Sequence, residues 1–456
     1  MTPAVSSEAS PEMVPSRTDA VIARGSEALG GPWGRLARTR PGPWPTISTL
    51  IVLATVGYIV GYLLDLSCIT TNWISPERYE HLCYSDIPAL YGIRGFADGL
   101  IPYVQIPAGG TPLEYPVLTG LFMWVAALVT AAIAPALYSG DVTRAFFDVN
   151  VVMLTPFVLV TVIASALSVR GKAWAAAMIA LAPSMILGAT INWDLIPVAL
   201  TALAFLAWVR AKPVPAGIFL GLAIASKFYP LILLGVFALL AIRTRSFRPA
   251  LDLLLTTIAT WSLVNIPFAI ANFDGWWYFY SFNSARGIDF GSVWYAVTEW
   301  GLPQVPDDAV NMVSLISFLV LVCVVAYVAL TAPRIPTVFA LGFLLLAAFV
   351  VTTKVYSPQY VLWLVPFAAL ARPRWRDFLI WQTGEVVYFA AIWWLLAAYG
   401  VEGAKGLHGG WYALATFIHV GVTIWYAILI IRDLYPSDQD ASSTSSNLDV
   451  VNRTSA

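Results

Sequence analysis

Five ionisable residues from distant parts of the chain interrupt long apolar segments. Charged groups near membrane depth are costly and usually pair with a partner or a ligand. Two carboxylates and three cations of this kind point to a site for a negatively charged lipid head group combined with an acid–base reaction. The alternative is a set of unrelated anchors at a membrane interface. The five residues are Asp86, Asp194, Lys227, Arg286 and Lys354.

The carboxylate with the strongest claim to chemistry is Asp86. It stands just before a short helical pattern, where an aspartate often serves only as the N-cap of the helix. An aspartate held there could equally take a proton from a sugar hydroxyl. The local sequence leaves both interpretations open. Glu114 is a second candidate in the same polar loop, and it precedes Tyr115-Pro116, which favours an extended backbone.

Two lysines stand where an apolar stretch is broken by a polar turn and a proline. In Ser226-Lys227-Phe-Tyr-Pro230 and in Lys354-Val-Tyr-Ser-Pro358, the apolar halves are short for a bilayer crossing. Such a lysine can snorkel to the interface, but we favour binding of a lipid phosphate. Paired broken helices also resemble the half-helix ion sites of transporters, so a lipid or sugar transporter or flippase stays open as an alternative.

A later polar loop is dense in aromatic residues. Trp276 and Trp277 stand near its start and Arg286 near its middle. Tryptophan and tyrosine collect at membrane interfaces, and their faces also stack on sugars. The planar fork of an arginine suits a phosphate.

The overall composition indicates the kind of fold that must position these residues. The 456 residues are 59% hydrophobic and 11% charged, with a mean hydropathy of +0.76, whereas soluble domains carry about 25% charged residues. This excludes a soluble enzyme and a disordered protein. The net charge of −1 gives no basic excess for a nucleic-acid partner. We therefore expect an all-α, polytopic membrane protein.

Apolar runs predict about twelve transmembrane helices. Lysine and arginine mark the short cytoplasmic loops. If a further apolar run, 116–136, crosses fully, Arg170 and Arg210 fall outside; if it is re-entrant, every basic cluster falls inside. We favour the re-entrant form; a missed short span is the alternative. The predicted spans are 47–64, 148–169, 174–191, 195–209, 214–226, 228–242, 249–271, 310–331, 336–352, 359–371, 378–400 and 411–431.

This topology divides the chain into a membrane domain, 47–431, and two disordered cytoplasmic tails, 1–46 and 432–456. Both termini are then cytoplasmic, and the extramembrane mass outside lies in two loops, 65–115 and 272–309. All five ionisable residues of the candidate site fall on the outer face.

A few remaining residues have ordinary explanations. Cys323 lies in an apolar run and is expected to be a buried, inert thiol. A disulfide between Cys68 and Cys83 depends on an oxidising exterior and stays open. Glu385, inside a span, is expected to join two helices, or to carry protons if the protein is a transporter.

Two familiar kinds of cofactor site have no sequence signal. The three histidines are scattered without metal-ligand spacing. No phosphate-binding glycine loop or dinucleotide glycine signature occurs, which argues against a nucleotide-sugar donor.

Several short motifs together resemble one family. The resemblance is to the integral-membrane glycosyltransferases of the GT-C superfamily, and more narrowly to glycosyltransferase family eighty-seven, the actinobacterial polyprenol-phosphate-mannose-dependent mannosyltransferases. It covers roughly 47–431. The matching residues are Ser85-Asp86-Ile87, Tyr91, Arg94-Gly95, Pro102-Tyr103, Tyr115-Pro116, Lys227-Phe-Tyr-Pro230 and Lys354-Val-Tyr-Ser-Pro-Gln-Tyr360.

The resemblance implies a GT-C fold and a polyprenyl-phosphate sugar donor, commonly mannose. Transfer to a glycolipid or cell-envelope glycan then occurs on the outer face of the plasma membrane, among membrane lipids, with inversion. Asp86 is the implied general base, and Lys227, Lys354 and Arg286 the implied phosphate ligands. The superfamily often carries Asp-x-Asp, but Pro88 occupies the third place here, so no metal or other cofactor is expected.

Further residues are expected to contact the substrates. They are Tyr91, Arg94, Tyr103, Glu114, Tyr115, Asp194, Trp276, Trp277, Tyr356 and Gln359. A non-catalytic structural partner of a cell-envelope complex is the third alternative.

Overall fold

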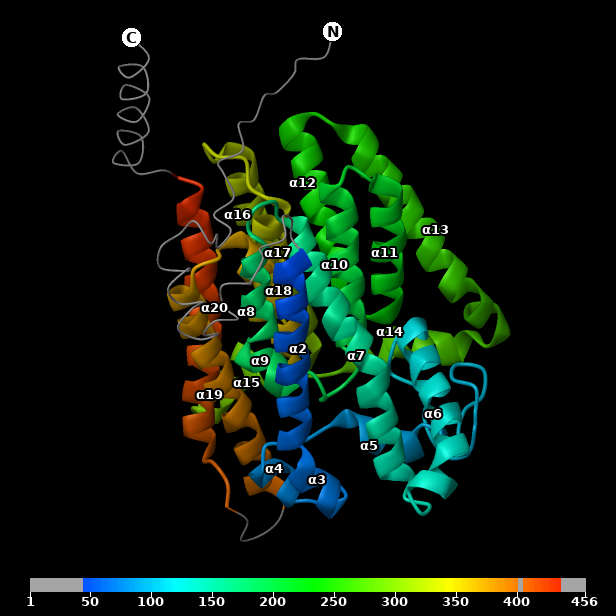
Figure 1. Ribbon diagram of the computed structural model, residues 1–456. Coiled ribbons are helices and arrows are strands. Elements are labelled where there is room, and N and C mark those ends of the chain that lie inside the picture. Colours follow the sequence, from blue (N-terminus) through cyan, green and yellow to red (C-terminus); the bar gives the residue numbers. More distant parts are fainter. Residues whose placement is uncertain (1–43, 401–404, 436–456) are drawn as a thin grey trace, which may run out of the picture.

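The computed structural model describes residues 44–400 and 405–435, and every regular element in these ranges is a helix (Figure 1). The expected tails, 1–46 and 432–456, lie almost wholly outside these ranges. Within these two ranges, seven helical segments are long and apolar enough to cross a membrane. This confirms an all-α, multi-pass membrane protein. The long helices are α2 (Trp44–Leu64, continued by α3, Leu66–Thr71), α6 (Val117–Leu137), α7 (Val142–Ser168), α13 (Phe247–Ala271), α16 (Asp307–Thr331), α19 (Trp375–Gly400) and α20 (Gly409–Asp433).

Five shorter apolar helices pack among the long ones. They are α10 (Leu195–Val209), α11 (Pro213–Ser226), α12 (Leu234–Thr244, preceded by η2, Tyr229–Leu233), α17 (Val338–Thr352) and α18 (Val361–Ala371, preceded by η3, Pro358–Tyr360). Small helices fill the connections: α4 (Glu77–Glu80), α5 (Asp86–Ile93), α14 (Phe273–Ala285) and α15 (Val293–Glu299).

The predicted span 174–191 is wrong as a continuous helix. The segment forms three short pieces, η1 (Ala173–Ala176), α8 (Ala177–Ala180) and α9 (Pro183–Gly188). Ala182 has an extended backbone and Pro183 starts the last piece. A residue before proline is disfavoured in the helical region, and proline has no N–H for the preceding turn, so the helix restarts there.

Helix α6 covers the segment expected to be re-entrant. Its length alone would allow a crossing. However, the Thr119 hydroxyl near its start donates to the carbonyl of Ser226, the last residue of α11, at 2.6 Å. The turn after α6 leads into α7, where Asp148 accepts a 2.9 Å hydrogen bond from Tyr62 near the end of α2. Helix α6 is one unbroken helix of 21 residues, about 31 Å long at 1.5 Å per residue, so it does not turn back on itself. The two contacts show where its ends pack, and the re-entrant form stays a prediction.

The short helices create a floor inside the bundle. Helices α10, α11 and α17 have 15, 14 and 15 residues, so each is about 21–23 Å long at 1.5 Å per residue, well short of α2 with its 21 residues. Helix α10 begins directly after Asp194, whereas α11 ends at Ser226, before Lys227, and α17 ends at Thr352, two residues before Lys354. Polar residues that flank short apolar helices are thereby brought together within the protein.

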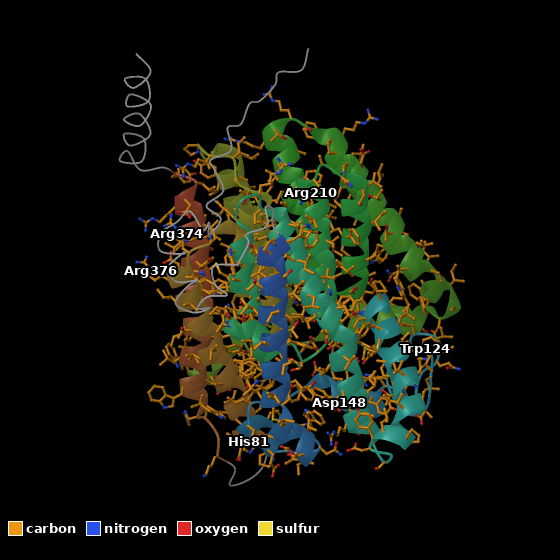
Figure 2. The ribbon with its side chains drawn as sticks, viewed as in Figure 1. His81, Trp124, Asp148, Arg210, Arg374 and Arg376 are labelled. Carbon is orange, nitrogen blue, oxygen red and sulfur yellow. A yellow bond between two sulfur atoms is a disulfide. The ribbon has the colours of Figure 1, made fainter. Side chains whose placement is uncertain are left out.

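The end of the bundle at which α2 begins is here called the basic end. It carries Arg210, Arg334, Arg372 and Arg374. Figure 2 shows Arg210 and Arg374 toward the end where α2 begins, and Asp148 and His81 toward the other end. Several residues that the topology assigned to cytoplasmic loops therefore share one end of the molecule.

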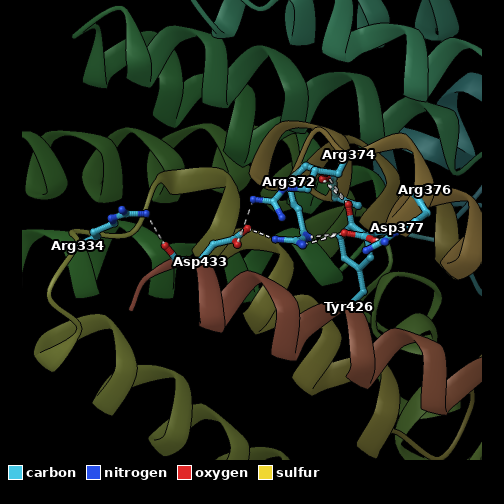
Figure 3. Close-up of polar contacts among 8 residues, drawn as sticks. Arg334, Arg372, Arg374, Arg376, Asp377, Tyr426 and Asp433 are labelled. Atoms are coloured by element: carbon cyan, nitrogen blue, oxygen red, sulfur yellow. Dashed lines mark hydrogen bonds and ion pairs between the residues drawn. The ribbon is translucent and has the colours of Figure 1, made fainter. Parts of the chain in front are cut away.

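A buried ion network closes part of the basic end (Figure 3). Arg372, 5% exposed, pairs with Asp377 at 2.8 Å and also with Asp433. The Tyr426 hydroxyl donates to the Arg372 carbonyl at 2.9 Å, and Arg334 donates to the Asp433 carbonyl at 3.1 Å. These contacts tie the end of α18 to α19 and α20.

Three smaller expectations meet the structure here. Glu385 on α19 lies 2.7 Å from His419 Nδ1 and accepts a 3.0 Å hydrogen bond from Thr423, both on α20, which confirms the helix–helix contact. Cys68 and Cys83 form a disulfide. The expected burial of Cys323 is wrong: its side chain is exposed, because it lies on the outward apolar face of α16 beside Leu319 and Val324.

Candidate active site

A cavity of about 680 Å³ lies above the floor formed by the short helices. Its wall comes from segments far apart in the sequence. Among the lining residues are Tyr84, Asp86, Glu114, Tyr115, Asn192, Lys227, Asn283, Arg286, Asp289, Gln359, Tyr360 and Trp393.

The Asp86 carboxylate lines this cavity and is held by two tyrosine hydroxyls. The N-cap of α5 is Ser85, whose hydroxyl oxygen accepts the N–H of Ile87 at 3.2 Å. The N-cap interpretation of Asp86 is therefore wrong, and its carboxylate is left for other contacts. It accepts hydrogen bonds from Tyr84 at 2.8 Å and from Tyr115 at 3.2 Å.

The surroundings raise the pKa of Asp86. Burial is the largest cause, and the nearby charge of Asp194 acts in the same direction. The two tyrosine hydrogen bonds and the charge of Lys227 oppose the rise in pKa. Burial disfavours the ionised form, so the carboxylate is a stronger base than an exposed aspartate. This property suits a group that removes a proton from a substrate hydroxyl.

Lys227 and Asp194 form an ion pair at the cavity floor. Lys227 Nζ lies 2.7 Å from Asp194 Oδ1, and Trp363 Nε1 donates to Asp194 Oδ2 at 2.9 Å. Asp194 is 1% exposed and does not line the cavity, whereas Lys227 does. The ammonium also lies 4.9 Å from the centre of the Tyr115 ring, within cation–π range. Asp194 therefore holds the lysine in place, and the lysine presents its charge to the cavity.

Arg286 forms the second cationic position. It is the C-cap of α14 and pairs with Asp289, with Nε at 2.7 Å from the carboxylate. Both residues line the cavity. Asp289 is anchored in turn, because its N–H donates to the Lys354 carbonyl at 2.9 Å.

Lys354 lies behind this wall and faces a second cavity. Its ammonium donates to the Ser284 carbonyl at 3.0 Å and to Asn311 Oδ1 at 2.6 Å. It is therefore near Arg286 in the fold but outside the cavity that holds Asp86.

The second cavity, of about 520 Å³, is mainly apolar and adjoins the first. Leu231, Leu315, Phe318 and Phe349 are among its walls. The two cavities share lining side chains: Lys227, Phe279, Asn283, Arg286 and Tyr360. The two cations thus stand where a polar chamber meets an apolar one.

Several residues expected to contact substrates do not line either cavity. Tyr91 stacks on Phe146 with ring centres 4.5 Å apart. Arg94 is engaged with Glu114 through two hydrogen bonds of 2.6 and 2.9 Å. The Tyr103 hydroxyl donates to the carbonyls of Tyr115 and Pro116 at 2.8 and 2.7 Å. These three side chains hold the shape of the loop instead.

The aromatic candidates also have structural contacts away from the cavities. Trp276 Nε1 donates to Asn265 at 3.0 Å. Trp277, 46% exposed, stacks on Tyr280 with centres 5.2 Å apart. Tyr356 is fully buried against His419, with ring centres 3.9 Å apart. Of the expected substrate contacts, Glu114, Tyr115 and Gln359 do line the cavity.

Several lining residues were not predicted, among them Tyr84, Asn192 and Trp393. Tyr84 stands two positions before Asp86 and Asn192 two before Asp194, so proximity to a marked carboxylate was an available signal. Trp393 lies in the last third of α19 and stacks on Tyr84 with ring centres 4.7 Å apart. Nothing in its local sequence separates it from other tryptophans of that helix.

Comparison with known proteins adds no further assignment. No protein-family model matches the chain, and no curated protein sequence matches it. The resemblance to the GT-C glycosyltransferases therefore still rests on the motifs alone.

Within residues 44–400 and 405–435, no three His, Cys, Asp or Glu side chains form a group that could hold a metal.

Proposed function

We propose that this protein is an inverting GT-C glycosyltransferase. It moves a sugar, mannose in our proposal, from a polyprenyl-phosphate donor to a glycolipid or cell-envelope glycan. The observation that carries the proposal is one cavity in which a tyrosine-held carboxylate, Asp86, faces the same space as Lys227 and Arg286.

The junction of the two cavities suits a lipid-linked phosphate. An isoprenoid chain is apolar, and the cavity that contains Leu231, Phe318 and Phe349 is of matching character. Lys227 and Arg286 stand at its boundary with the polar cavity, where a phosphate attached to such a chain would meet two cations. The sugar beyond the phosphate would extend into the polar cavity.

Asp86 acts as the general base in this proposal. It takes the proton of the acceptor hydroxyl while the hydroxyl oxygen attacks the anomeric carbon of the sugar. The bond from that carbon to the phosphate oxygen breaks, and polyprenyl phosphate leaves with the electron pair. Lys227 and Arg286 stabilise the charge that develops on the phosphate, and the cavity holds both substrates in line.

Two features favour placing this cavity on the outer face of a plasma membrane. The disulfide between Cys68 and Cys83 lies in the segment that leads to Asp86, and disulfides persist in oxidising compartments. The arginine-rich loops gather at the opposite end of the bundle, as expected of cytoplasmic loops.

The direct test is a transfer assay with purified protein. Labelled polyprenyl-phosphate mannose is incubated with the protein and a membrane lipid extract, and labelled products are identified. We expect a mannosylated lipid or glycan with an inverted anomeric centre. Release of no labelled product from any polyprenyl-phosphate sugar, with folded protein, would contradict the proposal.

A transporter or flippase is the second candidate. The observation that favours it is that two interrupted helix pairs, α11 with η2 and α17 with η3, meet near the cavities, as half-helices do in transporters. Cysteines introduced at positions 192 and 283 distinguish the two functions. Labelling from one side of the membrane supports the transferase, and labelling from both sides supports transport.

A further inference from the structure

A buried carboxylate at the end of α2 has no part in the chemistry described so far. Asp65 is 7% exposed, and no lysine or arginine within the described ranges forms an ion pair with it. Burying a carboxylate without a cation is costly unless hydrogen bonds compensate. The hydrogen bond that Asp65 accepts is therefore informative.

That hydrogen bond comes from Thr190, in the turn before Asn192. The Thr190 hydroxyl donates to Asp65 Oδ2 at 2.7 Å, and Thr190 is 3% exposed. The contact joins residues 125 positions apart. It fixes the backbone of the turn against the end of α2.

The backbone of the same turn also contacts the segment that carries Asp86. The Ser85 hydroxyl donates to the Thr190 carbonyl at 2.7 Å, and the Asp86 N–H donates to the Ile191 carbonyl at 2.7 Å. Ser85 is also the N-cap of α5. The start of α5 is thus docked on two successive carbonyls, and Asp65 anchors the segment that supplies them.

The disulfide adds an independent tie between the same two parts of the chain. Cys83 stands two residues before Ser85, and Cys68 lies in α3, directly after Asp65. The segment that leads to Asp86 is therefore held by the disulfide at Cys83 and by the hydrogen bonds from Ser85 and Asp86 to the carbonyls of residues 190 and 191.

We infer that Asp65 and Thr190 are positioning residues that set the place of the Asp86 carboxylate in the cavity. They act through Ser85 and the backbone of residues 190–191, without touching a substrate. The inference rests on the proposed role of Asp86. Loss of the dock would let Asp86 move away from the hydroxyls of Tyr84 and Tyr115, and a misplacement of about 1 Å can cost about 100-fold in rate.

The test compares two substitutions at one position. Thr190→Val removes the hydroxyl with little change of shape, and Thr190→Ser keeps it. For Thr190→Val we expect kcat to fall about 10–100-fold with a donor KM within about twofold of wild type. The rising limb of the pH–rate profile should move to higher pH, because the tyrosine hydrogen bonds that lower the pKa of Asp86 are weakened. Thr190→Ser should restore both.

A purely structural role gives a different result. Partial misfolding of Thr190→Val would reduce the amount of active protein and leave the pH limb where it is, and this outcome would overturn the inference. If Thr190→Val cannot be purified, Ser85→Ala removes the next hydrogen bond of the dock and is expected to show the same shift of the limb. An unshifted limb in Ser85→Ala would overturn the inference as well.

Hydrogen exchange keeps this test separate from the proposed function. In Thr190→Val, but not in Thr190→Ser, the amides of Asp86 and Ile87 should exchange faster, while those of α19 stay unchanged. Unchanged exchange at Asp86 would overturn the positioning role. Wild-type protein without transferase activity but with this exchange difference would refute only the proposed function.

Discussion

Two clusters of charged side chains, one at the basic end and one at the cavity, differ in how completely their charges are matched. At the basic end, Arg372 is paired with Asp377 and Asp433, and its carbonyl accepts from Tyr426. At the cavity, Lys227 and Arg286 each have one carboxylate partner and one side that lines an open space.

Asp86 sharpens this contrast. Its hydrogen bonds come from neutral hydroxyls, and its pKa is raised by burial. A structural ion network satisfies its members with one another, whereas a binding site leaves capacity for a ligand. Charge burial alone therefore does not identify a site, whereas an incompletely matched cluster at a cavity is a better indicator of one.

The largest expected effect is on the proposed base. Asp86→Asn keeps the size of the side chain and removes the base, so transfer should fall about 10²–10⁴-fold while the thermal midpoint of unfolding stays near the wild-type value. The measurement is initial transfer rate with saturating donor. The matched control is Asp98→Asn in the same loop, an exposed residue outside the cavities, which should transfer normally.

The next effect is on donor binding. Lys227→Met removes a charge from the cavity junction and should raise the donor KM about tenfold or more, since a charged hydrogen bond contributes about 1.5–3 kcal/mol. Because this variant leaves Asp194 buried without its cation, the double variant Lys227→Met with Asp194→Asn serves as the folded control. A native donor KM in the folded double variant would contradict a phosphate site at Lys227.

The network at the basic end should respond in stability instead of catalysis. Asp377→Asn leaves Arg372 with Asp433 as its carboxylate partner and should lower the free energy of unfolding by about 1–3 kcal/mol. Thermal unfolding in detergent measures the loss. The donor KM should be unchanged, and a large rise in KM would show that the two clusters are coupled.

The smallest expected effect is a displacement of the pH profile. A general base works when deprotonated, so kcat/KM should rise with pH through the pKa of Asp86. Burial raises that pKa above the ordinary value for aspartate, and the rising limb should therefore lie at higher pH than an exposed aspartate would give. Measurement of kcat/KM across the acidic range checks this. A flat profile there would argue against Asp86 as the base.

Much of the fold was predictable from the sequence, because apolar length is a strong signal for membrane helices. The break at Ala182-Pro183 was available in the sequence but was hidden by the apolar residues around it. The exposure of Cys323 was not predictable, since an apolar run does not reveal which of its faces meets lipid and which meets protein.

The charged residues of the candidate site were predictable from the sequence, but the residues with which they pair were not. Scarcity of charge made Asp86, Lys227 and Arg286 conspicuous, and all three line one cavity. The pairing of Lys227 with Asp194 joins residues 33 positions apart through the packing of α10 on α11, which no local pattern encodes. The residues Tyr91, Arg94 and Tyr103 were selected by the family resemblance, and the structure shows that they hold the shape of the loop.

The central claim is that Asp86 performs the chemistry in a cavity whose cations bind the donor. It is tested most directly by measuring donor binding and transfer on one sample of Asp86→Asn. We expect a Kd for polyprenyl-phosphate mannose close to that of the wild type, with transfer at about a hundredth of the wild-type rate or less. Transfer at a near-native rate by this variant would contradict it.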